Sequence, residues 1–156
     1  MIVLPADFRD LLAALHDAGA AFVVVGGHAV AFHGHARATK DLDVLVRADR
    51  ENAGRVYRAL AAFGAPLESF AVTADDFTDY DGVLQIGLPP LRVDILNRIA
   101  GVTFGDATSA GDAFELDGRK IPVIGFEALI RNKQASGRPQ DIADVHALLE
   151  GAESVS

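Results

Sequence analysis

The sequence lacks the residues and motifs on which several common site chemistries depend. It contains no cysteine, which excludes a disulfide framework, a thiol nucleophile and a thiolate metal site. None of its three lysines follows a glycine, so there is no GxxxxGKS or GxxxxGKT phosphate loop, and the dinucleotide pattern GxGxxG is also absent. No GxSxG occurs, which argues against a serine nucleophile on a strained strand-to-helix turn.

Positive charge and long apolar runs are also scarce. The 14 lysines and arginines face 22 aspartates and glutamates, and the net charge of −8 argues against a broad electrostatic grip on nucleic acid but permits a local basic funnel. The start, MIVLPADFRD, lacks the basic and apolar regions of a signal peptide. The longest apolar stretch, 20–36, is broken by glycines and histidines and is too short to span a bilayer. We therefore expect a cytoplasmic protein without a membrane segment.

The residues that are present suffice for a packed core. Half of the 156 residues are hydrophobic, which predicts one domain over 1–156. Because predicted helices alternate with strands and hairpins, we expect a mixed-sheet α/β (α+β) fold with flanking helices and a C-terminal helical pair. Apolar periodicity and the placement of glycine and proline predict helices at 5–18, 28–35, 49–63, 126–136 and from 139, and a helical or irregular piece at 103–110.

The predicted strands are short and end at glycine and proline signals. Residues 65–81 show no clear period, and their structure stays open. A tight connection at Gly87 and Pro89-Pro90 is expected between two of the strands, and Asp117-Gly118 is typical of a hairpin turn. The strands are expected at 22–25, 41–46, 83–88, 91–96, 114–116 and 120–124.

Three aspartates lie on the polar faces of two predicted strands, Asp41 and Asp43 on one and Asp94 on the other. Like charges this close repel unless a hard divalent ion or a basic partner neutralises them. Two magnesium ions held by such carboxylates clamp a transferring phosphoryl or nucleotidyl group. The alternative is structural, in which the aspartates form ion pairs with nearby basic residues, namely Arg37, Lys40 or Arg92.

A glycine turn precedes the first aspartate pair. Gly26-Gly27 follows a β-branched run and starts a predicted helix, and thirteen residues separate it from Asp41. Glycines allow a phosphate to approach the backbone, and amides at a helix start offer donors. A glycine pair alone is more often only a turn. With the carboxylates, however, this spacing resembles the nucleotidyltransferase superfamily of the DNA polymerase beta type.

The resemblance covers about 22–148, and two strings within it point to a smaller group of the superfamily. The strings GGHAVAFHGHARATKDLDVLV and KQASGRPQDIADVHAL look like small bacterial nucleotidyltransferases related to AbiE-type abortive-infection toxins. The resemblance implies that Gly26 and Gly27 hold the triphosphate and that magnesium binds Asp41, Asp43 and Asp94. It also implies that Asp94 orients or deprotonates the attacking hydroxyl. Many members have serine at the position of Gly27, so a side-chain contact with phosphate would be missing here.

Other polar residues near these motifs are candidates for nucleotide contact. Arg37, Thr39 and Lys40 lead into the aspartate strand, and the alternative is exposed loop charge. His28 follows the glycine turn and would reach phosphate if exposed. Lys133 resembles a lysine placed near the nucleotide in the related toxins, and a solvated helix lysine is the alternative.

The tail carries two further aspartates, Asp141 and Asp144, three residues apart on one helical face. We interpret them as structural, through the dipole at the helix start or through pairing with Arg138.

The sequence thus predicts transfer of a nucleoside monophosphate from a nucleoside triphosphate to an acceptor hydroxyl with the aid of two magnesium ions. The acceptor stays open between a protein, an RNA end and a small molecule, and so does the preferred base. One alternative is a weakly catalytic or non-catalytic partner protein of a toxin-antitoxin pair, encoded beside its partner. Another is a metal-dependent phosphohydrolase, which would leave the glycine turn unexplained.

Overall fold

The computed structural model describes residues 4–78, 83–86 and 92–155. A four-stranded mixed sheet lies at its centre, with β1 (Phe22–Val25), β2 (Asp41–Val46), β4 (Arg92–Leu96) and β3 (Val83–Ile86) in that order across the sheet. β2 and β4 run parallel, whereas β1 and β3 are antiparallel to their neighbours. The mixed-sheet α/β prediction is confirmed.

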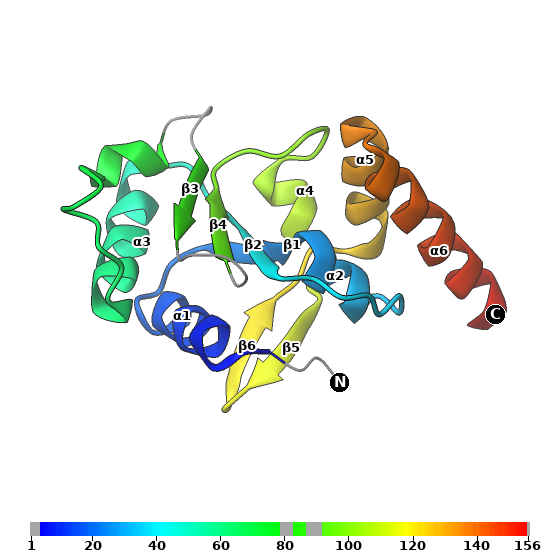
Figure 1. Cartoon of the computed structure of the whole chain (residues 1–156), viewed down its shortest axis with the longest axis horizontal. Coiled ribbons are helices and arrows are strands. Elements are labelled where there is room, and N and C mark those ends of the chain that lie inside the picture. The colour runs from blue at the N-terminus through cyan, green and yellow to red at the C-terminus, as the bar shows by residue number, and fades with distance from the viewer. Residues whose placement is uncertain (1–3, 79–82, 87–91, 156) are drawn as a thin grey trace.

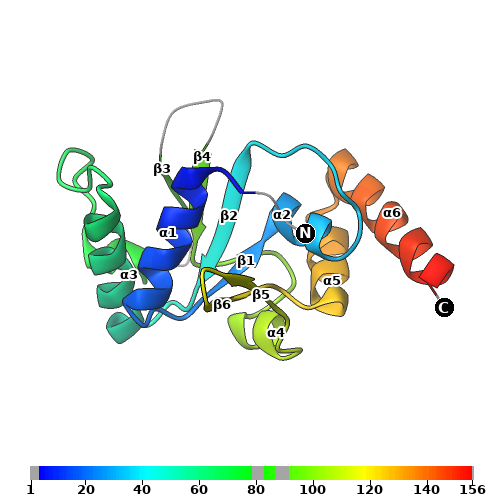
Figure 2. The same ribbon diagram turned by 90° about the horizontal axis from the view of Figure 1, so that it is seen from below.

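Helices flank the sheet as the apolar periodicity predicts. α1 (Ala6–Asp17) and α3 (Arg50–Phe63) pack together on one side, and the core joins their buried leucines to the aliphatic side chains of β1 and β2. On the other side lie α2 (Gly26–Phe32) and the pair formed by α5 (Phe126–Ser136) and α6 (Pro139–Val155), which is seen beyond α2 in Figures 1 and 2. The side chain of Asp49 caps α3, as its position before the helix predicts.

A hairpin of β5 (Ala113–Leu116) and β6 (Arg119–Pro122) extends this arrangement. Its turn residues Asp117 and Gly118 have φ of 50° and 80°, the left-handed conformation that a tight hairpin turn requires. The second strand ends two residues earlier than expected, because Val123 bridges to Val24 instead and joins the hairpin to β1.

The segment without a clear pattern is only partly regular. It forms turns and a single 3-10 turn, η1 (Ala74–Phe77), and Leu67 and Phe77 are buried in the core. The piece after 103 is a short helix, α4 (Phe104–Thr108). The expected connection at Gly87 and Pro89-Pro90 lies outside the described residues. No helix among the described residues has the length and apolar character that crossing a bilayer demands.

Candidate active site

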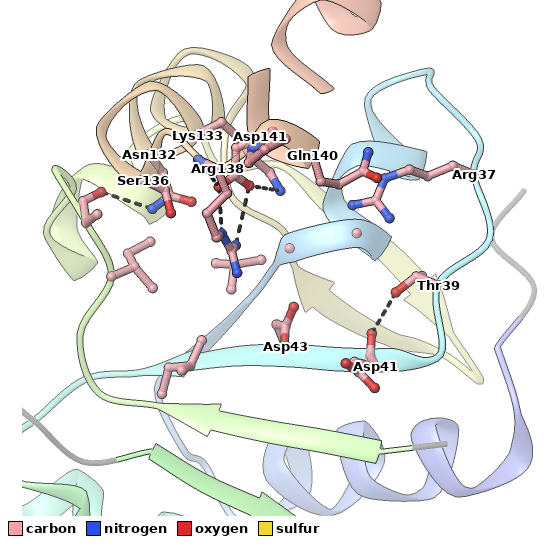
Figure 3. A pocket seen from close by; sticks show the side chains of 17 residues that line it. Arg37, Thr39, Asp41, Asp43, Asn132, Lys133, Ser136, Arg138, Gln140 and Asp141 are labelled. Carbon is pink, nitrogen blue, oxygen red and sulfur yellow. Dashed lines mark hydrogen bonds and ion pairs between the residues drawn. The ribbon is translucent and has the colours of Figure 1, made fainter. Parts of the chain in front are cut away.

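A pocket of about 600 Å³ lies between the start of α2, the polar face of β2 and the α5–α6 pair (Figure 3). It gathers residues that are more than 100 positions apart in the sequence. Seven of the residues predicted for the site line it, namely Gly26, Gly27, Arg37, Thr39, Asp41, Asp43 and Lys133.

The parallel pairing of β2 with β4 brings two carboxylates together. Asp43 is in register with Asp94, and neighbouring strands are about 4.8 Å apart. Burial, followed by the charge and hydrogen bonding of Asp94 and the charge of Asp41, raises the pKa of Asp43 to about 7. The Oδ1 atom of Asp94 is buried and has no hydrogen-bond partner. Both observations fit a pair of oxygen ligands for a hard cation such as magnesium.

Asp41 is placed differently, because its carboxylate faces Arg92. The guanidinium Nη2 of Arg92 donates to Asp41 Oδ2 over 3.3 Å, and its Nε lies 3.9 Å from Asp94 Oδ1. For Asp41 the structural alternative, an ion pair with Arg92, therefore holds in this structure. Across the described part of the chain, no three histidine, aspartate or glutamate side chains form a ready-made metal-binding group. Asp43 and Asp94 fit a metal as they stand, whereas Asp41 would first have to leave Arg92.

The glycine turn lies directly against this carboxylate pair. Val25 pairs with Asp43 across the sheet, so the turn that follows it passes over the Asp43 side chain. Gly26 has φ of 68°, and a Cβ atom on it would lie 2.1 Å from Asp43 Oδ2. A Cβ atom on Gly27 would lie 2.9 Å from the Thr39 hydroxyl. Glycine is therefore required at both positions, and a serine at 27 would collide with Thr39.

Three cations line the opposite wall of the pocket. Lys133 is buried, with Nζ 3.1 Å from Asp141 and 3.0 Å from Asp144. Arg37 donates two hydrogen bonds to Asp144, and Arg138 Nε donates to Asp141 over 2.8 Å. The alternative of a solvated Lys133 is wrong. Pairing of Asp141 with Arg138 is confirmed, but Asp144 pairs with Arg37 across 107 positions of sequence.

These ion pairs keep the tail carboxylates charged. Burial alone would raise the pKa of Asp141, but hydrogen bonds from Arg138 and Lys133 outweigh it and lower that pKa to about 2. Burial also opposes ionisation of Asp144, and hydrogen bonds from Arg37, Lys133 and Gln140 lower its pKa as well. The buried aspartates therefore hold three cations beside the pocket.

Three predicted site residues are not among those that line the pocket, namely Asp94, which lies on β4 beside Asp43, and His28 and Lys40. His28 is only 7% exposed, and its ring packs edge to face against Phe8 at 5.7 Å. The predicted contact of His28 with phosphate is therefore wrong, because the side chain points into the protein. Burial, followed by the charge of Arg37, lowers the pKa of His28. Lys40 is exposed and does not line the pocket. Arg138 also lines the pocket but was not predicted as a site residue, although it lies in the string KQASGRPQDIADVHAL.

A mixed sheet that carries paired carboxylates against a glycine turn defines a nucleotidyltransferase fold. The chain belongs to the family described as "Nucleotidyl transferase of unknown function (DUF2204)", whose model matches residues 5–155. Among proteins with curated descriptions, none matches.

Two solved structures share the fold. One is the antibiotic-resistance factor ANT(2'')-Ia, with 18% identity, a TM-score of 0.59 and coverage of 96% of this chain and 85% of that one. The other is an antigenic nucleotidyltransferase-like protein from Paracoccidioides brasiliensis, with 16% identity, a TM-score of 0.52 and coverage of 94% and 78%. At these identities the similarity concerns the fold alone.

Proposed function

We propose that the protein is a magnesium-dependent nucleotidyltransferase that moves a nucleoside monophosphate from a nucleoside triphosphate to an acceptor hydroxyl. The acceptor oxygen forms a bond to the α-phosphorus, the bond from that phosphorus to the bridging oxygen breaks, and pyrophosphate leaves. The observation that supports this most directly is the close approach of Gly26 to Asp43, which places bare backbone beside a carboxylate in a pocket that is also lined with cations.

Each group in the pocket has a distinct task under this proposal. Gly26 and Gly27 let Asp43 and Thr39 pack against the bare backbone of the turn, and this turn lines the pocket in which the triphosphate would lie. Arg37 and Lys133, held by the buried tail aspartates, offset the charge of the triphosphate. Asp94 accepts the proton of the attacking hydroxyl. Since no covalent enzyme intermediate is needed, positioning and charge neutralisation supply the catalysis.

Magnesium would be held by Asp43 and Asp94, joined by Asp41, and two such ions supply charge neutralisation on the phosphates and the attacking oxygen. The donor set contains only oxygen, which suits magnesium better than a transition metal. The pKa of Asp43 is raised to about 7, so the ionised carboxylate is destabilised and a bound cation would stabilise it.

Calorimetric titration of the four nucleoside triphosphates tests this function. Each is added to the protein with magnesium and again with EDTA, and the experiment is repeated with Asp41→Asn/Asp43→Asn. The matched control is Asp10→Asn, which changes an exposed carboxylate on α1. We expect binding that requires both magnesium and the site aspartates. Binding of none of the four by folded protein, or equal binding by the double variant, would contradict the proposal.

Product analysis separates transfer from the phosphohydrolase alternative. Hydrolysis releases nucleotide without labelling any acceptor, whereas transfer of an α-labelled nucleotide leaves the label on one. A protein, an RNA end or a small molecule could each accept it, and the net charge of −8 favours a long nucleic acid least.

The relation to AbiE-type toxins and a cytoplasmic location belong to the same proposal. The C-terminal segment supports the relation to AbiE-type toxins. Its sequence similarity to them is loose, but its Lys133 contacts both Asp141 and Asp144 beside the pocket. A neighbouring gene for a small helical or regulatory partner would favour a toxin-antitoxin system, and transfer that requires the gene product would identify the partner.

A further inference from the structure

The pocket of the proposed active site is polar and charged at one end and neutral at the other. Figure 3 shows Arg37 and Thr39 on one side of the Arg138 side chain. Asn132 and Ser136 lie on its other side. We name the neutral side the Asn132 end, and it is formed by five uncharged residues of the lining, namely Leu96, Ile99, Ala100, Asn132 and Ser136. A nucleoside triphosphate has the same asymmetry, with negative charge on its phosphates and none on its base.

The Asn132 end is built where the turn after β4 packs against α5. Asn132 Nδ2 donates to the Ala100 carbonyl over 2.9 Å. Gly101 has φ of 71°, and a Cβ atom on it would lie 2.7 Å from the Cβ atom of Ala135, so glycine permits this close packing. The hydrogen bond orients the Asn132 amide, because its nitrogen faces Ala100 and its Oδ1 is an acceptor. Ser136, one helical turn further along α5, adds an exposed hydroxyl to the same wall.

Apolar side chains lie between the carboxylates and this wall. Leu96 follows Asp94 by two residues on the same face of β4, which places it about 7 Å farther along the strand. Ile99 lies three residues beyond, and both apolar side chains are half-buried and line the pocket. In a nucleotide, the ribose separates the α-phosphate from the base by a comparable length. An α-phosphate held near Asp43 and Asp94 therefore leaves the base within reach of Leu96.

We propose that the nucleotide lies across the pocket with its base at the Asn132 end, packed on Leu96 and Ile99; this rests on the proposed function. Asn132 Oδ1 accepts a hydrogen bond from an N–H group of the base, a group that each of the four common bases carries. The triphosphate extends the other way, toward Arg37 and Thr39. The opposite orientation would place charged phosphates on the apolar side chains of Leu96 and Ile99, at a cost in desolvation.

Inorganic triphosphate is a suitable probe, because it has the phosphates of the substrate but no base. Calorimetry with magnesium compares it with the four nucleoside triphosphates. We expect Asn132→Ala to weaken binding of the preferred nucleoside triphosphate about fivefold, as the loss of one hydrogen bond allows, and to leave the Kd of inorganic triphosphate unchanged. Arg37→Gln should weaken binding of both. Gln134→Ala removes an exposed amide of α5 outside the pocket and, as the matched control, should change neither.

A second measurement locates the base directly. In the complex with the preferred nucleoside triphosphate, NMR should show nuclear Overhauser effects between the base protons and the methyl groups of Leu96 and Ile99. Their absence would overturn the proposal. So would an unchanged affinity of Asn132→Ala for all four nucleoside triphosphates, or an equal loss for inorganic triphosphate. If none of the four binds the folded, unsubstituted protein, the proposed function itself is refuted, and the base site with it.

Discussion

Replacing Asp43 by asparagine should stabilise the metal-free protein, and should do so more strongly at pH 8 than at pH 5. The cause is the position of Asp43, which is partly buried at the wall of the pocket and in register with a second carboxylate. Asparagine has nearly the same shape and carries no charge. The substitution therefore removes the repulsion without opening a cavity.

The magnitude follows from the pKa of Asp43, which is raised from 3.8 to about 7. Well below pH 3.8 the group is protonated in both the folded and the unfolded chain and costs nothing. As the pH rises toward 7, the unfolded chain ionises and the folded chain does not, so stability falls by about 1.4 kcal/mol per pH unit. Above pH 7 the full penalty applies, on the order of 4 kcal/mol, of which less than half is already present at pH 5.

Thermal unfolding in EDTA at pH 5 and pH 8 measures the difference. For a chain of this size 1 kcal/mol shifts Tm by about 2–4 °C, so the gain in Tm from Asp43→Asn should be about 5–10 °C larger at pH 8 than at pH 5. Asp10→Asn, on the exposed face of α1, is the matched control. Magnesium should raise Tm of the unsubstituted protein at pH 8 and leave that of Asp43→Asn nearly unchanged. An equal gain at both pH values, or a loss at pH 8, would refute the reasoning.

Three further substitutions probe the neighbours of Asp43. Gly26→Ala should lower Tm more than Gly19→Ala. Both glycines have φ near 70°, where an alanine costs about 1–2 kcal/mol, but only the Cβ at position 26 would collide with Asp43. Equal losses of Tm would contradict this. Arg92→Gln should raise magnesium affinity about fivefold or more in calorimetry, since it removes a positive charge about 4 Å from the carboxylates, and an unchanged or weaker affinity would show that Arg92 does not compete. Lys133→Met should destabilise the protein by about 3 kcal/mol in denaturant unfolding, because it leaves two buried carboxylates short of a partner; a neutral effect would show that the arginines suffice.

Local patterns were enough to predict most elements of the fold. Alternation in β2 and β4 identified the polar faces, and the aspartate before α3 and the glycine after it marked the ends of that helix. Sequence patterns failed for 65–81, because the buried residues of its described part, 65–78, are Leu67 and Phe77, and these follow neither period. They are placed by packing against α3 and the core, which leaves no local trace.

The site was less accessible to sequence reasoning, because its key contacts join distant segments. Arg37 and Asp144 are 107 positions apart, and no rule of spacing connects them. The burial of His28 depends on α1 lying beneath it, and the partner of Asp41 depends on the register that sets Arg92 opposite.

The two walls of the pocket explain how an acidic chain can offer a site for a polyphosphate. The net charge of the chain is −8. Part of its negative charge lies on the carboxylates of β2 and β4, which form one wall of the pocket and attract cations. The opposite wall presents Lys133, Arg37 and Arg138 together with Asp141 (Figure 3), and the buried Asp144 on α6 pairs with Lys133 and Arg37. Charge of both signs is thus separated across one pocket, as a metal and a triphosphate bound together require.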